Sequence, residues 1–293
     1  QDEMNLRIKA GVDKFYNVEK MSNNDIASLS RSLEIDIAID LGGFTANNKF
    51  EIFAINTAPI QINYLGYPGT MGADFYDYII ADKIIIPEEQ KRNYSENIIY
   101  LPSCYMPQDS SRQISKKLIT RQECNLPEDG FVFCSFNNSF KITPKEFVIW
   151  MRLLSKIDGS VLWLLKANKS SEDNLRIEAK KRGVEPNRLI FADKIAVEEH
   201  LARQRLADLF LDTFNFNAHT TASDALWAGL PVLTKLGKGF AARVAGSLLT
   251  SLEVPELITT SEKEYEALAL NLASNPEKLA IIKKKLADIE NQL

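Results

Sequence analysis

A polar segment around His219 has the residue types and spacing of a phosphate site. It reads FNFNAHTTASDALWAG (214–229) and directly follows an apolar run that ends in Asp-Thr. Thr221 and Asp224 have the spacing of a capping box, which predicts a helix that begins at Thr221. The start of such a helix offers free N–H groups and a positive dipole end, to which His219, Thr220 and Thr221 would add side-chain donors. The alternative is that Thr221 and Asp224 only cap the helix and His219 is a surface loop residue.

Lys141 lies in a second loop of the same kind. It follows the apolar run FVFCSF (131–136) and precedes Thr143-Pro-Lys-Glu146, a strong helix start with a capping Thr and a Glu three residues later. An ammonium group there would neutralise a diphosphate leaving group, where negative charge develops during transfer. The alternative is a solvated surface lysine.

A third segment, FADKIAVEEHLARQRLAD, carries His200 and Arg203 three residues apart on one predicted helical face. Both histidines of the chain thus fall at one edge of one predicted sheet. The alternative is a solvated helix in which Arg203 forms a surface pair with Glu199.

In the first half, LGYPGT places Gly66 and Gly69 around Pro68, after the apolar run IQINY. Such turns let backbone approach a ligand, although the segment is neither a Walker loop nor G-x-G-x-x-G. A plain connecting turn is the alternative. Asp40, at the end of DIAIDL (36–41), would orient a ligand hydroxyl or cap the following segment.

The elements that position these residues alternate between apolar runs and helical patterns. In the second half five runs alternate with helices, which favours a doubly wound, Rossmann-like α/β domain. First-half runs lie at 14–18, 36–41, 60–66, 76–82 and 97–102, with a helix near 23–34. Second-half strands are expected at 131–136, 160–165, 188–193, 207–213 and 231–235. Helices are expected at 144–156, 171–182, 197–205, 221–228, 240–252 and 262–293.

The Pro- and Ser-rich stretch at 102–117 reads as a linker between two domains. We therefore predict two domains, at 1–110 and 111–293. Strand ends of two such domains would face a shared cleft.

Bulk composition excludes several classes of protein. The formal charge of -4 over 293 residues gives little support to a nucleic-acid partner. No apolar stretch reaches the ~20 residues that span a bilayer, so no membrane association is expected. Three cysteines without metal spacing indicate a reduced, cytoplasmic protein. Since Asp-x-Asp and H-E-x-x-H are both missing, we expect no metal or other cofactor.

Two stretches, LGYPGT and HTTASDALWAGLP, carry a specific family resemblance. Over roughly residues 30 to 285 the chain resembles the catalytic region of the O-linked N-acetylglucosamine transferases, which include SPINDLY-type proteins. The resemblance implies a GT-B fold, with two Rossmann-like domains facing a cleft: a partial N-terminal, acceptor-side domain at 1–110 and a nucleotide-sugar-binding domain at 111–293. It also implies metal-independent, inverting transfer of N-acetylglucosamine from a UDP-sugar to Ser or Thr hydroxyls of an acceptor protein.

The resemblance also implies a role for each matching residue. Lys141 would stabilise the UDP leaving group with Asn138 beside it, and Asp224 would contact the ribose. His200 and Arg203 would contact the nucleotide. The pyrophosphate would be bound by His219, Thr220 and Thr221. On the N-terminal side of the cleft we place Asp40, Gly66, Tyr67, Pro68, Gly69 and Thr70.

Two alternatives stay open at this point. The first is that the donor is another nucleotide sugar such as GDP-fucose, which SPINDLY-type relatives use. Compared with the family, the chain reads as a piece truncated at both ends, so it would be inactive alone if the absent segments complete the site. It would then be a nucleotide-binding module without catalysis. The acceptor protein and oligomeric state are not readable from the sequence.

Overall fold

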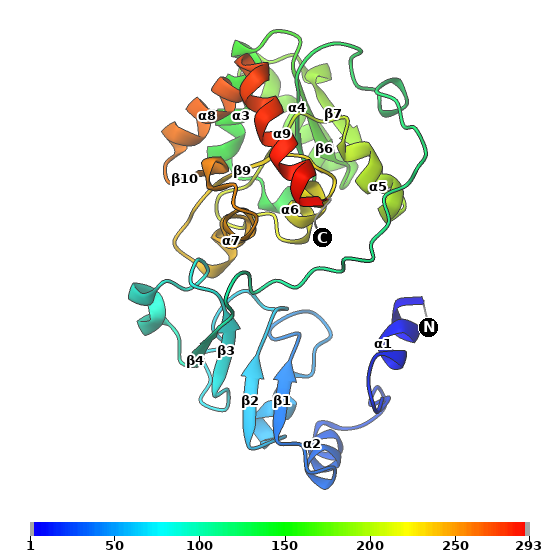
Figure 1. The fold of residues 1–293 in the computed structure, drawn as a ribbon, viewed down its shortest axis with the longest axis vertical. Helices are drawn as coiled ribbons and strands as arrows, with labels where there is room; N and C mark the ends of the chain where they lie inside the picture. Colours follow the sequence, from blue (N-terminus) through cyan, green and yellow to red (C-terminus); the bar gives the residue numbers. More distant parts are fainter. Residues whose placement is uncertain (1–2, 291–293) are drawn as a thin grey trace. The chain divides into compact units, whose positions relative to one another are not determined.

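The structure is a computed structural model that describes residues 3–290. It divides into two compact units, Gln1–Ile80 with Gln90–Ile99, and Ala81–Glu89 with Tyr100–Leu293. Each unit has its own sheet (Figure 1). The assignment of 1–110 and 111–293 to two functional domains stays a prediction.

The first unit is built on a four-stranded sheet with the order β1-β2-β3-β4. The printed pairings of β1 with β2 and of β2 with β3 are parallel. The strands are β1 (Ile37–Asp40), β2 (Ile60–Asn63), β3 (Tyr78–Ala81) and β4 (Asn97–Tyr100), and the helices are α1 (Glu3–Ala10) and α2 (Asn23–Ser32). The prediction of a strand at 14–18 is wrong, because the segment pairs with no strand and its Phe15 and Tyr16 are exposed.

The second unit has a six-stranded sheet with the order β10-β9-β8-β5-β6-β7, and its pairings are parallel. The strands are β5 (Val132–Ser135), β6 (Val161–Leu165), β7 (Leu189–Ala192), β8 (Leu209–Leu211), β9 (Val232–Lys235) and β10 (Ile258–Thr259). Numbered from β5, this is the 3-2-1-4-5-6 order of a doubly wound fold, whose switch point lies between β5 and β8. The Rossmann-like prediction is confirmed, and β10 is an additional strand.

The helices of the second unit also follow the sequence pattern, except at 240–252, where a 3-10 turn at 240–242 precedes a helix that begins at Val244, and at 262–293. They are α3 (Pro144–Lys156), α4 (Lys169–Lys181), α5 (Val197–Gln204), α6 (Thr220–Trp227), α7 (Val244–Ser251), α8 (Glu262–Ser274) and α9 (Pro276–Glu290). The single helix predicted at 262–293 is wrong, because Asn275 adopts φ -131°, ψ 86° before Pro276 and ends α8. Proline disfavours helical backbone in the residue before it. The predicted end at 291–293 lies outside the described residues.

Short 3-10 helices complete the chain: η1 (Phe50–Ile55), η2 (Glu88–Asn93), η3 (Gln122–Cys124), η4 (Ser139–Lys141), η5 (Pro186–Arg188), η6 (Phe240–Ala242) and η7 (Pro255–Leu257). The core of the second unit contains fully buried aromatic side chains, among them Trp150, Trp163, Phe133, Phe136 and Phe210. α3 packs against α8, and α8 against α9 (Figure 1). Within residues 3–290, none of the helices combines the length and the apolar character that crossing a bilayer requires.

Candidate functional site

The loops that follow β5 and β8 meet at the switch point of the second sheet. Lys141 ends η4, after β5, and its Nζ donates to the carbonyl oxygen of Asn217, after β8, at 2.9 Å. The same Nζ lies 4.2 Å from the centroid of the Phe216 ring. The structure therefore brings Lys141 to the loop that leads into α6, at the edge where open α/β sheets bind ligands.

The charge of Lys141 is held in partly desolvated surroundings. Burial lowers the pKa of Lys141 to about 8, while the carboxylate of Asp212 acts in the opposite direction. The ammonium group is thus the main form at pH 7. Because water screens it less than a surface lysine, it would interact more strongly with an anionic ligand.

Asp212 is fully buried at the end of β8 and organises this loop. Its Oδ1 accepts from the backbone N–H groups of Thr213 at 2.8 Å and Ala218 at 2.6 Å. Its Oδ2 accepts from the hydroxyl of Thr234 at 2.7 Å. Burial raises the pKa of Asp212 to about 7, although these donors and Lys141 favour the ionised form. The sequence interpretation assigned Asp212 no role; the signal was an acid that closes an apolar run.

Asn137 connects the loop after β5 with the loop after β8 through side-chain hydrogen bonds. Its Nδ2 donates to the hydroxyl of Thr213 at 3.0 Å, and its Oδ1 accepts from the hydroxyl of Thr221 at 2.8 Å. Asn137 is buried, whereas the predicted nucleotide contact Asn138 is exposed at the start of η4. The sequence interpretation did not single out Asn137, because nothing in the pair Asn-Asn shows which member is buried.

The start of α6 differs from the prediction. The helix begins at Thr220 with His219 as its N-cap, and no side chain caps it. The prediction of a capping box by Thr221 and Asp224 is wrong. The Thr221 hydroxyl donates a hydrogen bond to Asn137 instead, and Asp224 is ion-paired with Arg112. Tertiary partners have replaced the local hydrogen bonds that the spacing allowed.

His219 is partly buried and is not a free surface residue. Its ring stacks on Phe216 with centroids 4.6 Å apart, and its Nε2 lies 3.1 Å from the carbonyl oxygen of Ala241. Since a carbonyl only accepts, Nε2 carries the hydrogen and Nδ1 is left as an acceptor. Burial lowers the pKa of His219 to about 4, so the ring is neutral at pH 7. Thr220 is exposed.

His200 and Arg203 contact each other on α5. Arg203 Nε donates to His200 Nδ1 at 3.0 Å, and Arg203 Nη1 donates to the carbonyl oxygen of Asp193 at 2.8 Å. Burial lowers the pKa of His200 to about 4, and the charge of Arg203 acts in the same direction. The suggested pair of Arg203 with Glu199 is wrong, because Glu199 pairs with Lys117 at 3.3 Å.

Arg203 also borders a polar hollow of about 230 Å³ at the carboxyl ends of β6 and β7. Its guanidinium lies 5.6 Å from the ring centroid of Phe136 and 5.8 Å from that of Trp163. The lining includes Trp163, Asp193, Ile195 and Arg203. An aromatic wall with charged groups is typical of sites that take a planar polar ring.

The predicted residues of the first unit form a cluster of their own. Asp40 Oδ1 accepts from the backbone N–H groups of Gly42 at 2.9 Å and Gly43 at 3.0 Å, and its Oδ2 from the Tyr76 hydroxyl at 2.5 Å. Of the two roles considered for Asp40, the structure displays the capping of the following segment.

The LGYPGT loop follows β2 and is fixed by the protein itself. A Cβ atom on Gly66 would lie 2.2 Å from the carbonyl oxygen of Leu41, so glycine is required there. Asn63 Nδ2 donates to the Gly69 carbonyl at 3.1 Å, and the Thr70 hydroxyl donates to Glu96 at 2.5 Å. Tyr67 packs edge to face on Phe44, and Pro68 lies between these anchored positions.

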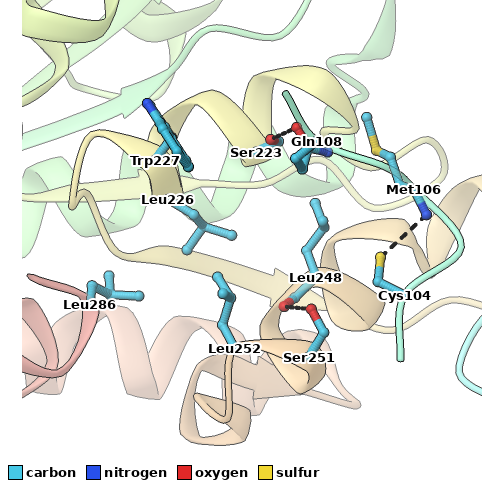
Figure 2. A pocket seen from close by; sticks show the side chains of 10 residues that line it. All are labelled: Cys104, Met106, Gln108, Ser223, Leu226, Trp227, Leu248, Ser251, Leu252 and Leu286. Atoms are coloured by element: carbon cyan, nitrogen blue, oxygen red, sulfur yellow. Dashed lines mark hydrogen bonds between the residues drawn. The ribbon is translucent and has the colours of Figure 1, made fainter. Parts of the chain in front are cut away.

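A separate apolar cavity of about 120 Å³ lies beside α6 (Figure 2). Leu226, Trp227, Leu248 and Leu252 contribute to its wall, and neither Lys141 nor the start of α6 lines it. Apolar packing, and not the chemistry of the candidate site, dominates this cavity. Among residues 3–290, no three His, Cys, Asp or Glu side chains gather as a metal-ligand set.

Two α/β units with parallel sheets, one of them with a polar, cationic site at its switch point, give the chain a GT-B-like fold. The chain matches the family model "Glycosyl transferase family 41" over residues 1–119 and 110–292, and it belongs to that family. It superposes on a mutant of the Thermobaculum terrenum O-GlcNAc transferase with a TM-score of 0.90 and 26% identity. That match covers 100% of this chain and 55% of the other.

Two curated plant relatives match almost the whole chain. The chain is 38% identical to the probable UDP-N-acetylglucosamine–peptide N-acetylglucosaminyltransferase SEC of Arabidopsis thaliana, over 97% of this chain and 30% of the relative. It is 33% identical to the probable transferase SPINDLY of the same plant, over 96% of this chain and 31% of the relative. The chain thus spans about a third of these relatives' length.

Proposed function

We propose that the chain transfers N-acetylglucosamine from UDP-N-acetylglucosamine to Ser or Thr hydroxyls of an acceptor protein. The observation that carries the proposal is the position of Lys141, a partly buried cation held between the β5 and β8 loops at the switch point. The names of the relatives supply the sugar and the class of acceptor.

In the proposed reaction, the oxygen of the acceptor hydroxyl forms a bond to the anomeric carbon and loses its proton to water, while the bond between that carbon and the UDP oxygen breaks. Negative charge then develops on the diphosphate, which the Lys141 ammonium and the first N–H groups of α6 would stabilise. Thr220 supplies an exposed hydroxyl at this helix start, whereas the Nε2–H of His219 is engaged by Ala241. Lys141 is therefore the side chain on which the proposal places most of the leaving-group stabilisation.

The remaining parts of the nucleotide have their own proposed contacts. Asp224 would accept from the ribose hydroxyls. The hollow beside Arg203 would hold the base, with His200 orienting the Arg203 guanidinium through its Nδ1. Asn138, exposed at the start of η4, would contact the nucleotide-sugar beside Lys141.

We further propose inversion of the anomeric centre and independence from metal ions. Asp212 is fully buried and its oxygens accept from protein donors, so it is not placed to form a covalent sugar intermediate, and a single displacement inverts. Lys141 and α6 supply positive charge that a metal ion would otherwise provide. Free thiols at Cys104, Cys124 and Cys134 suit a reducing, cytoplasmic compartment.

The test is calorimetric titration of UDP into the chain with EDTA present, followed by a transfer assay with UDP-N-acetylglucosamine and a Ser/Thr acceptor peptide. Lys141→Ala should weaken UDP binding and reduce turnover about 100- to 1000-fold, as is typical when one donor to a developing charge is removed. Lys145→Ala, an exposed lysine four residues later, is the matched control and should behave like the wild type.

Each other result has a distinct meaning. Binding of GDP in place of UDP would indicate a different nucleotide sugar. UDP binding without transfer would indicate a nucleotide-binding module. Near-normal turnover of Lys141→Ala would refute the role of Lys141.

A further inference from the structure

Arg112 lies in the segment between β4 and η3 and ties it to α6. Its Nη1 donates to Asp224 Oδ1 at 2.5 Å, and its Nη2 lies 3.3 Å from the hydroxyl oxygen of Ser223. The guanidinium carbon lies 5.2 Å from the centroid of the Trp227 ring. Gln108, from the same segment, accepts a hydrogen bond from the Ser223 hydroxyl (Figure 2). A stretch that reads as a linker in the sequence is therefore fastened to the helix that begins at the candidate diphosphate site.

The pair of Arg112 and Asp224 is mostly removed from solvent. Their side chains are 17% and 14% exposed. Burial raises the pKa of Asp224, and the charge and hydrogen bond of Arg112 oppose this shift. Arg112 thus helps to keep a buried carboxylate ionised.

Fold stability alone is a weak reason for such a pair. Burying two charges costs desolvation that their attraction often fails to offset, and an apolar pair of similar volume is frequently as stable. Arg112 Nε is, in addition, buried without a hydrogen-bond partner in the described chain. An unsatisfied donor adds to the cost of keeping the pair.

The geometry leaves one oxygen of Asp224 for a ligand. Oδ1 is occupied by Arg112, while Oδ2 takes part in no hydrogen bond among residues 3–290. A carboxylate oxygen has lone pairs for two donors, which suits the adjacent hydroxyls of a ribose.

We propose that Arg112 is a positioning residue for the nucleotide: it holds Asp224 Oδ1 so that Oδ2 is turned to the ribose hydroxyls, which makes the site selective for ribonucleotides. This inference rests on the proposed function, since that function supplies the nucleotide. Arg112 itself does not contact the substrate. It acts through the orientation and charge of Asp224.

The experiment compares the affinities of UDP and 2′,3′-dideoxy-UDP by calorimetry. Hydrogen bonds to a charged group contribute about 1.5–3 kcal/mol, so the wild type should prefer UDP by roughly 10- to 100-fold. Arg112→Gln should lose most of this preference, with the affinity for the dideoxy nucleotide changed less than about threefold. Arg112→Lys keeps the charge and should restore part of the preference.

Two further variants separate positioning from a purely structural role. Asp224→Asn should lose the same preference, and the double variant Arg112→Gln/Asp224→Asn should lose no more than either single variant, because both act on one contact. Lys116→Gln removes an exposed cation from the same segment and should leave both affinities unchanged. Thermal unfolding of every variant verifies that each one is folded.

Equal losses for both nucleotides, or additive losses in the double variant, would overturn the inference. So would a wild type that binds both nucleotides equally. Failure of the proposed function looks different: the wild type would then bind no UDP, or its UDP affinity would be unaffected by Lys141→Ala.

Discussion

Lys141 Nζ donates to the carbonyl oxygen of Asn217 at 2.9 Å across 76 residues of sequence. This hydrogen bond connects the loop after β5 to the loop after β8, the two strands that flank the switch point of the sheet. A phosphate oxygen that enters the site would compete with this carbonyl for the ammonium group. Lys141 is therefore held in place by an acceptor that a stronger, anionic acceptor can replace.

The low pKa of Lys141 predicts how UDP binding depends on pH. Burial lowers this pKa to about 8, so the fraction of ammonium falls as the pH rises from 7 to 9. We expect UDP affinity to be nearly constant below pH 7.5 and to decrease by up to about tenfold per pH unit above 8, as linkage requires. Calorimetric titration at pH 7, 8 and 9 measures this directly.

Lys141→Arg is the control, because arginine stays charged throughout this range. Its UDP affinity should vary little from pH 7 to 9, even if it is weaker overall. An identical decrease in both proteins would assign the pH dependence to another group.

The raised pKa of Asp212 predicts that its contribution to the free energy of unfolding decreases as the pH rises. Its folded-state pKa of about 7 lies above the ordinary value of 3.8, so the folded chain binds a proton that the unfolded chain has lost in this window. The contribution of Asp212 to stability is complete below pH 4 and is lost as the pH rises to about 7. Asp212→Asn should remove this contribution, so the difference in unfolding free energy between wild type and variant should change from pH 4.5 to 7.5.

Urea denaturation at several pH values provides that difference. Asp212→Ala serves for comparison, because it leaves the N–H groups of Thr213 and Ala218 without their acceptor. It should cost about 1–3 kcal/mol for each group that stays unsatisfied. A constant difference between wild type and Asp212→Asn across the range would contradict the assignment.

Most of the second sheet could be predicted from the sequence because its strands are continuous apolar runs between helices. The stretch SVLWLL, for example, contains β6, whose first four residues are buried. The run at 14–18 failed because Phe15 and Tyr16 have no partner strand, and pairing is not encoded in so short a segment. Asn275-Pro276 ends a helix inside a periodic pattern, and here the proline was the available signal.

The loops that form the candidate site could be predicted from the sequence, but most of the contacts between their side chains could not. Lys141 could be placed by the position of its loop between β5 and α3. The partners of Asp224 and Thr221 could not, because Arg112 and Asn137 lie 112 and 84 residues away in sequence. Capping spacing is a local signal, and long-range hydrogen bonds override it.

Gly66 predicts a steric requirement in the first unit. A Cβ atom there would lie 2.2 Å from the Leu41 carbonyl oxygen, which is backbone and cannot rotate away. We expect Gly66→Ala to destabilise the chain by about 2 kcal/mol or more, in the range of severe core strain. Gly69→Ala, in the same loop, meets only the Tyr67 ring at 3.3 Å and should cost clearly less. Thermal unfolding of both variants tests this, and equal melting temperatures would refute it.

Glu146 couples the start of α3 to the position of Lys141. It is fully buried, and its carboxylate accepts from the backbone N–H and the hydroxyl of Thr143, both at 2.5 Å. Only Ile142 separates Thr143 from Lys141. The start of α3, which the sequence predicts and the structure contains, therefore also fixes the end of the loop that carries Lys141. Glu146→Ala should destabilise the fold by about 1–3 kcal/mol through the lost hydrogen bonds.

The same variant should weaken UDP binding although Glu146 lies outside the proposed contacts, because the Lys141 loop loses its anchor. Thr143→Ser keeps the hydroxyl and is the matched control for both measurements. If Glu146→Ala lowers the unfolding free energy but binds UDP as the wild type does, then Lys141 is positioned by the Asn217 carbonyl and the Phe216 ring without help from the helix start.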